Sequence, residues 1–152
     1  MIKTNHFSWT LSDLEETLCF GENLTKIYPS INLLLLTGPL GAGKTSLVKG
    51  IAIGIGINEP VTSPTFALAQ HYLSGHRPLV HMDLYRLENP ALANELFLQE
   101  EEEANSINAL LIVEWPERLS LSLPEAWRGD LQQSKKGERI FQLHPPLEEE
   151  RN

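Results

Sequence analysis

Residues 38–45 read Gly-Pro-Leu-Gly-Ala-Gly-Lys-Thr and satisfy the pattern G-x-x-x-x-G-K-[ST] in full. Glycines let the backbone turn its N–H groups inward around a β-phosphate without Cβ clashes. Lys44 would place a positive charge against the β- and γ-phosphates, and the Thr45 hydroxyl can ligate Mg²⁺. The segment predicts a site for a nucleoside triphosphate and Mg²⁺. Its expected binding residues are Gly38, Gly41, Ala42, Gly43, Lys44, Thr45 and Ser46.

A P-loop of this kind needs a carboxylate for its metal, usually at the end of a neighbouring buried strand. Glu114 ends the apolar run ALLIVE, although Asp is the usual residue there, and Asp83 ends the run PLVHMD. Thr65 lies in the loop VTSPTF, where a hydroxyl group can sense the γ-phosphate as in a switch loop. We expect Lys44, Asp83, Glu114 and Thr65 to be catalytic, and Thr45 and Glu114 to hold the metal. The alternative for each acid is a structural carboxylate in a cap or salt bridge.

The elements around these residues are read from hydrophobic periodicity and turn residues. An S-x-x-E capping box at Ser12 and Glu15 predicts the start of a helix that Pro29 ends. The other expected helices cover 45–53, after the glycine loop, and 90–98, with Asn89 as the N-cap of the second. The expected strands are 6–10 at an edge, 31–36, 66–72 and 78–85 as a hairpin, 109–115, and a late hairpin around 135–137.

This order predicts an α/β fold with a mixed sheet around a parallel centre. At 152 residues and without internal repeats, the chain is expected to be one domain over 1–152, with a frayed tail at about 146–152.

Composition limits the partners. The net charge is −8 and the basic residues are scattered, so we expect no strong direct binding to nucleic acid. No long apolar stretch predicts a membrane span and no signal peptide is evident, so the cytoplasm is the expected location.

Cys19, the one cysteine, is expected to be a small buried residue of a helix. The acidic run 100–103 is expected to be a solvated helix face, with a metal or partner site as the alternative, and the five histidines offer no metal spacing.

Four segments together resemble the TsaE family of bacterial ATPases: GPLGAGKTSLVKG, VTSPTFAL, HMDLYRL and LLIVEWPERL. The resemblance covers about residues 31–119. It implies a three-layer P-loop NTPase fold, with a parallel central sheet and flanking antiparallel strands. It implies an ATP- and Mg²⁺-dependent protein required for forming threonylcarbamoyladenosine in tRNA. The implied partners are TsaD and TsaB: TsaD transfers the threonylcarbamoyl group, and ATP hydrolysis resets the complex. The chain would then meet tRNA only through that complex.

By position, the resemblance assigns phosphate and Mg²⁺ binding to Lys44 and Thr45, and the metal-linked acid to Glu114. It assigns positioning of the attacking water to Asp83 and the switch-like hydroxyl to Thr65. Trp115 would be a neighbouring aromatic residue, with a core tryptophan as the alternative.

The sequence departs from the family pattern at two positions. Pro39 stands where the family usually has an acidic residue, and Phe97 replaces the glycine of an E-L-G-L segment. Pro39 lies in the variable part of the loop, so phosphate binding should survive. Phe97 is expected to alter the local backbone or a partner contact.

The competing interpretation is a small P-loop kinase acting on a nucleotide or small molecule. Such kinases clamp the transferring phosphoryl group with several arginines in a mobile lid. The six arginines here are spread from Arg77 to Arg151 with no paired cluster, which disfavours a kinase. A GTPase would need a base-reading N-K-x-D segment, and the sequence has none. We therefore expect an ATPase that is weak alone and depends on its partners.

Overall fold

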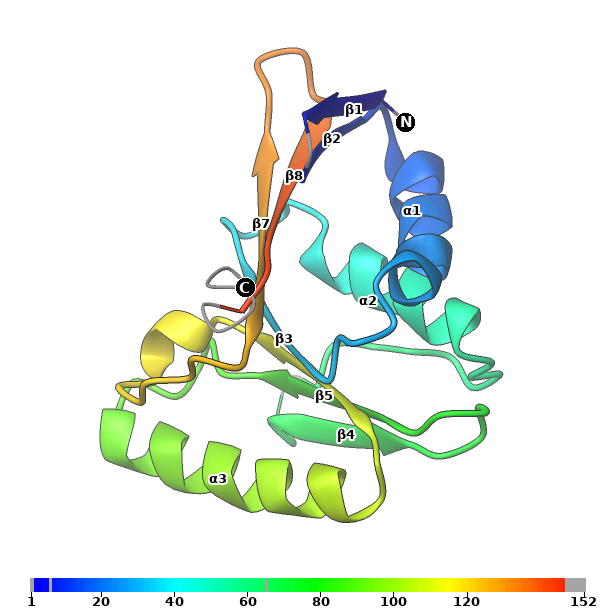
Figure 1. Cartoon of the computed structure of the whole chain (residues 1–152). Coiled ribbons are helices and arrows are strands. Elements are labelled where there is room, and N and C mark those ends of the chain that lie inside the picture. The colour runs from blue at the N-terminus through cyan, green and yellow to red at the C-terminus, as the bar shows by residue number, and fades with distance from the viewer. Residues whose placement is uncertain (1, 6, 65, 147–152) are drawn as a thin grey trace.

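The computed structural model describes residues 2–5, 7–64 and 66–146. Three helices and a short 3₁₀ helix surround one sheet within these residues (Figure 1). The helices are α1 Leu14–Ile27, α2 Lys44–Gly54, α3 Pro90–Ser106 and η1 Pro116–Arg118. The strands are β1 Ile2–Asn5, β2 Ser8–Leu11, β3 Leu33–Thr37, β4 Ala69–Tyr72, β5 Leu79–Asp83, β6 Leu110–Glu114, β7 Trp127–Gln133 and β8 Arg139–His144.

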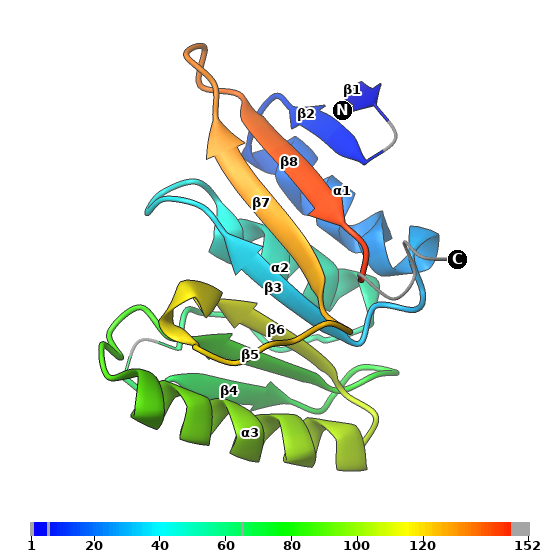
Figure 2. The same cartoon turned by 60° about the vertical axis from the view of Figure 1, so that its left-hand side comes forward.

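The sheet has the order β1-β2-β8-β7-β3-β6-β5-β4, which Figure 2 shows face-on. Strands β7, β3, β6 and β5 are mutually parallel and form its centre. Antiparallel strands extend it on both sides, β4 beside β5, and β8, β2 and β1 beyond β7. The predicted parallel centre with flanking antiparallel strands is confirmed.

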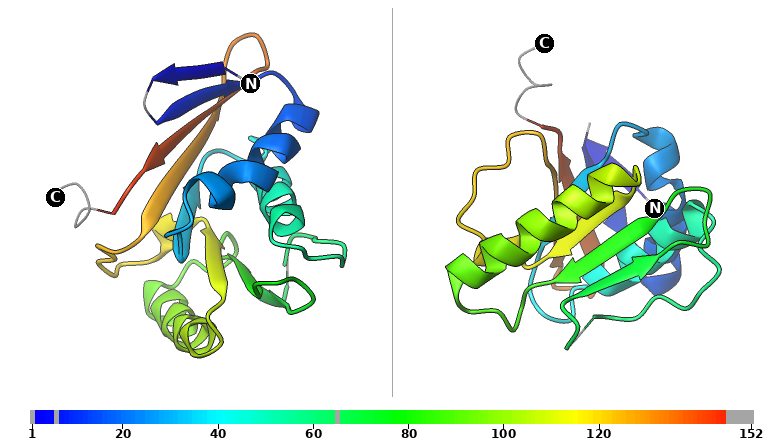
Figure 3. Two further views of the ribbon diagram at one scale, coloured as in Figure 1. Left: turned by 45° about the vertical axis from the view of Figure 1, so that its right-hand side comes forward. Right: turned by 90° about the horizontal axis from the view of Figure 1, so that it is seen from below.

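The central strands bury both faces. Leu34 and Leu36 of β3 pack into one core with residues of α1 and α2. Leu33 and Leu35 face the other way into a second core that contains Phe97 of α3. Figure 3 shows α1 and α2 on one side of the sheet and α3 on the other. The result is the predicted three-layer arrangement, because alternate residues of a strand point to opposite faces.

Helices α1 and α2 pack closely because glycines meet where they cross. A Cβ atom added at Gly50 would lie 2.4 Å from the carbonyl oxygen of Leu18 and 3.1 Å from the Cα atom of Gly21. No side chain larger than hydrogen fits this contact without a shift of backbone. The approach fixes α2, and therefore the loop that precedes it, against the rest of the molecule.

Several local predictions need correction. The cap of α1 is Asp13, which accepts a hydrogen bond from the backbone N–H of Glu16 at 2.9 Å, so the predicted pair Ser12 and Glu15 is one residue early. Strand β2 is not at an edge, because β1 pairs with it. Cys19 is exposed rather than buried. Phe97, the departure from the family pattern, is fully buried in the core under α3.

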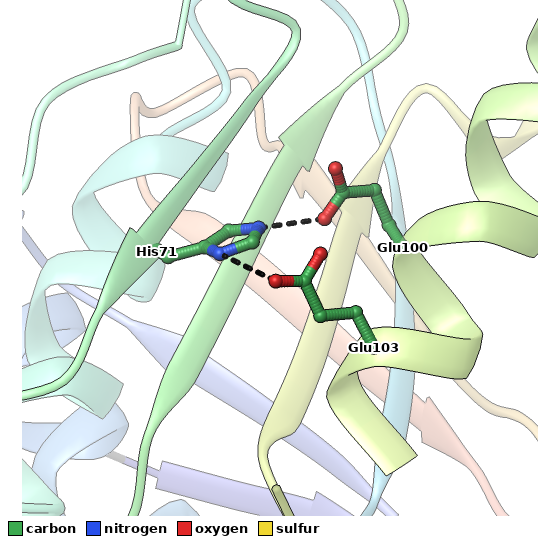
Figure 4. Close-up of side chains that lie close together, drawn as sticks. All are labelled: His71, Glu100 and Glu103. Atoms are coloured by element: carbon green, nitrogen blue, oxygen red, sulfur yellow. Dashed lines mark hydrogen bonds and ion pairs between the residues drawn. The ribbon is translucent and has the colours of Figure 1, made fainter. Parts of the chain in front are cut away.

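Helix α3 runs through the acidic run 100–103, and part of that run is not simply solvated. The imidazole of His71, on β4, lies between two glutamates of α3, as Figure 4 shows. Its Nε2 atom is 2.6 Å from a carboxylate oxygen of Glu100, and its Nδ1 atom is 3.8 Å from Glu103. The three side chains tie the edge strand to the helix. Their separation in sequence hid this histidine–carboxylate cluster from spacing arguments.

Residues 147–152 lie outside the described part of the chain, so the predicted frayed tail stays a prediction. Among the residues that the structure does describe, no helix is both long and apolar enough to cross a lipid bilayer.

Candidate active site

A cavity of about 420 Å³ opens where the central parallel strands end and α2 begins. Ligand sites of α/β proteins occur at this edge of the sheet. Strand register places Asp83 beside Glu114, and Glu114 beside Leu36 just before the glycine loop. The cavity is lined by Leu14, residues 39–46, Ser63, Asp83, Glu114, Trp115 and Arg139.

The glycine loop adopts the backbone conformations that its glycines permit. Gly38, Gly41 and Gly43 all have positive φ angles, of 140°, 79° and 103°. Gly38, predicted to bind phosphate, does not line the cavity, and an added Cβ atom there would be 2.2 Å from the carbonyl oxygen of Leu131. Gly43 is the N-cap of α2, so the loop leads directly into the positive end of that helix. This arrangement is an anion cradle.

Lys44 is buried at the start of α2, and its ammonium group contacts the backbone of the glycine loop. The group donates hydrogen bonds to the carbonyl oxygens of Gly38 and Pro39, the latter at 3.1 Å. It also lies 4.5 Å from the ring centroid of Trp115. Burial lowers the pKa of Lys44, and the nearby carboxylates, Glu114 foremost, oppose this shift only in part. An anion in the cradle would stabilise the charged form of this lysine.

Glu114 is 3% exposed and is held by two donors. The Thr45 hydroxyl donates to its carboxylate at 3.2 Å, and the Nε2 atom of His81 lies 2.6 Å from the same oxygen. A hydroxyl and a carboxylate side by side at the cradle are oxygen ligands of the kind that Mg²⁺ prefers. The residues present therefore fit the predicted metal, with Thr45 and Glu114 as the groups that would hold it.

Asp83 also lines the cavity, with its carboxylate held in place by two neighbours. The hydroxyl of Ser63 donates to it at 3.2 Å, and the backbone N–H of Tyr85 donates at 3.0 Å. Ser63 belongs to the loop in which the sequence placed the switch-like hydroxyl. Thr65 itself lies outside the described residues.

Trp115 follows Glu114 directly and adopts a left-handed backbone conformation, with φ 59° and ψ 50°. For a bulky residue this is an uncommon conformation, and such strain concentrates at functional sites. The ring faces Lys44 and also packs 4.8 Å from the ring of Tyr85. Trp115 therefore lies at the site and also against the core beneath α3.

Three polar residues of the site were not predicted: Ser63, His81 and Arg139. His81 precedes Asp83 by two positions, so strand alternation places both on one face, and this signal was available in the sequence. Ser63 is two residues from the predicted Thr65. Arg139 carried no local signal, because only the pairing of β8 with β7 and β2 brings it to the glycine loop.

The sequence profile of the family described as threonylcarbamoyl adenosine biosynthesis protein TsaE matches residues 11–141. The chain belongs to the TsaE family. The matched range includes the glycine loop, both acidic residues, Trp115 and Arg139.

Individual relatives agree with this assignment. The tRNA threonylcarbamoyladenosine biosynthesis protein TsaE of Synechocystis is 44% identical over 118 residues, which cover 76% of this chain and 73% of that protein. The protein of the same name in Bacillus subtilis is 36% identical over 117 residues, covering 77% and 71%. In structure, the chain is similar to the crystal structure of Bacillus subtilis YdiB, with a TM-score of 0.68, 26% identity and coverage of 100% and 99%. The TsaE-family chain thus has the predicted P-loop α/β fold.

Proposed function

We propose that this TsaE-family chain binds ATP with Mg²⁺ and hydrolyses it. The observation that carries the proposal is the hydrogen bond between Thr45 and Glu114 at the mouth of the anion cradle. It joins the hydroxyl that follows the P-loop lysine to the strand-end carboxylate, the two protein groups that P-loop NTPases use for their metal. Lys44 and the loop N–H groups supply positive charge beside them.

In this proposal each residue acts on a different part of the nucleotide. The backbone N–H groups of Gly41, Gly43 and Lys44 bind the β-phosphate, while that of Ala42 is donated to the carbonyl oxygen of Pro39. The ammonium group of Lys44 opposes the charge that develops on the γ-phosphoryl oxygens. Bound Mg²⁺ would neutralise part of the charge on the β- and γ-phosphates. Asp83 orients the attacking water, and the hydrogen bond from Ser63 holds its carboxylate toward the cavity. Thr65 would act as the γ-phosphate sensor of the same loop.

We further propose that hydrolysis resets the TsaD–TsaB transferase between rounds of tRNA modification. Membership in a family of threonylcarbamoyl adenosine biosynthesis supports the pathway. The open cavity supports weak activity of the chain alone, because a solvent-accessible site orients water poorly. The negative net charge of the chain supports contact with tRNA through its partners rather than directly.

The test measures phosphate release from ATP by the purified chain, with and without purified TsaD and TsaB. We expect slow release by the chain alone and a clear rise when both partners are present. Fast release that the partners leave unchanged would overturn partner gating. Accumulation of a phosphorylated small molecule in place of free phosphate would favour the kinase.

A further inference from the structure

Arg139, the first residue of β8, places its side chain at the anion cradle. The antiparallel register pairs it with Leu11 of β2 and Gln133 of β7. A Cβ atom built at Gly43 would lie 2.9 Å from the Nε atom of Arg139 and 3.3 Å from its Cδ atom. The side chain lines the same cavity as Lys44, Thr45 and Glu114. A second cation therefore borders the loop that would hold the phosphates.

This cation has no anionic partner among the residues that the structure describes. Its Nε atom is buried without a hydrogen-bond partner there, and no ion pair to Arg139 forms within these residues. Arg77 donates to backbone and side-chain oxygens that include Ile31 and Asn32. The Nε atom of Arg118 is also buried without a partner among the described residues, but its Nη2 atom donates to the carbonyl oxygen of Tyr85. Arg139 thus differs from them in keeping its hydrogen-bonding capacity unused at a cavity.

The chemistry of the cavity indicates what would use this capacity. A buried donor without an acceptor is costly, and a guanidinium matches the oxygens of a phosphate group with two parallel N–H donors. Lys44 has only one N–H group left for a phosphate in this arrangement, because it donates the other two to carbonyl oxygens of the loop.

We propose that Arg139 is a phosphate-binding residue of this site, contacting the nucleotide diphosphate moiety beside Gly43. The inference rests on the proposed function and adds a second cationic ligand to it. Arg139 sets the affinity for the phosphates of the nucleotide and contributes nothing to recognition of its base. Because Arg139 belongs to β8, the antiparallel strands beyond β7 also contribute to the nucleotide site.

The test compares two ligands of the full chain, ADP and pyrophosphate, by displacement of a fluorescent ADP analogue in the presence of Mg²⁺. Pyrophosphate offers the phosphates alone. We expect Arg139→Gln to weaken both ligands by the same factor, about 10- to 100-fold, as for loss of a hydrogen bond to a charged group. Arg139→Lys should recover part of the loss for both. Lys135→Gln is the matched control, because it removes one charge from an exposed position of the same hairpin and should leave both affinities unchanged.

The outcomes separate this inference from the proposed function. If wild type binds both ligands and Arg139→Gln binds them with the same affinities, the role of Arg139 is overturned. The nucleotide site itself would stand. If Arg139→Gln binds ADP more weakly but binds pyrophosphate as wild type does, Arg139 contacts the base or ribose. That result would also overturn its role in phosphate binding. A wild-type chain that binds neither ligand would overturn the nucleotide site itself. Thermal unfolding of each variant, together with the Arg139→Lys variant, shows whether a loss reflects binding or misfolding.

Discussion

The Nε2 atom of His81 lies 2.6 Å from a carboxylate oxygen of Glu114, and both side chains are buried. An ionised carboxylate only accepts hydrogen bonds, so Nε2 carries the proton in this pair. The hydroxyl of Thr45 donates to the same carboxylate oxygen. The Nδ1 atom of His81 has no partner among the described residues. The contact with Glu114 is therefore what His81 contributes to the site.

We expect His81→Leu to raise the Mg²⁺ concentration needed for half-maximal nucleotide binding by about 10- to 100-fold, the usual cost of losing a partner that orients a metal ligand. His81→Gln keeps an N–H donor within reach of Glu114 and should restore most of the Mg²⁺ affinity. The measurement is nucleotide binding over a Mg²⁺ titration, with thermal unfolding as a check on folding. Equal Mg²⁺ requirements in wild type and His81→Leu would contradict the positioning role.

The lowered pKa of Lys44 predicts a pH dependence of nucleotide binding. Burial is the main cause of the shift, so the ammonium group loses its proton at a lower pH than an ordinary lysine. Because phosphate binding favours the charged form, affinity for ADP should fall as the pH rises through the lowered pKa of Lys44, below the pH at which an ordinary lysine loses its proton. Lys44→Arg, which stays charged over this range, should show a shallower fall in ADP affinity. Parallel curves for the two proteins would contradict the prediction.

Glu101 predicts a pH effect on stability. Burial, and then repulsion from Glu125, raise the pKa of Glu101 in the folded chain. At a pH between the pKa of Glu101 in the unfolded chain and its higher pKa in the folded chain, the folded chain binds more protons than the unfolded one. The free energy of unfolding therefore falls as the pH rises through that window. Glu101→Gln should raise the urea midpoint at pH about 7, and the gain should shrink as the pH approaches about 4. Glu102→Gln, an exposed neighbour with the same change of charge, should shift the midpoint less.

The close contact of α1 and α2 predicts the cost of a single methyl group. Gly50→Ala would place Cβ 2.4 Å from the carbonyl oxygen of Leu18, so we expect a loss of about 1–3 kcal/mol in unfolding free energy. The better helix propensity of alanine is too small to offset that clash. Lys49→Ala, an exposed change in the same helix, should stay within about 0.5 kcal/mol of wild type. A chain stabilised by Gly50→Ala would show that the helices can separate at little cost.

The features of this molecule that depend on short segments could be predicted from the sequence. The glycine loop between β3 and α2, the β4–β5 hairpin and the acids that end β5 and β6 all lie where local pattern placed them. Strand alternation and turn residues act over a few positions, so they are visible in one chain.

Features that depend on long-range pairing could not be predicted in the same way. Arg139 reaches the cradle only because β8 pairs with β7 and β2. His71 meets α3 because β4 and α3 pack together. The cap of α1 differs by one residue because Asp13 competes with Ser12 for the same role, and both are good caps.

Phosphate release from Mg·ATP by the wild-type chain and by Lys44→Ala, each with TsaD and TsaB present, tests the central claim most directly. Thermal unfolding of both proteins establishes that the variant is folded. Because Lys44 opposes the charge that develops in the transition state, we predict that the variant releases phosphate about 100- to 1000-fold more slowly than wild type. Equal rates of release from the folded variant and wild type would contradict ATP hydrolysis at this site.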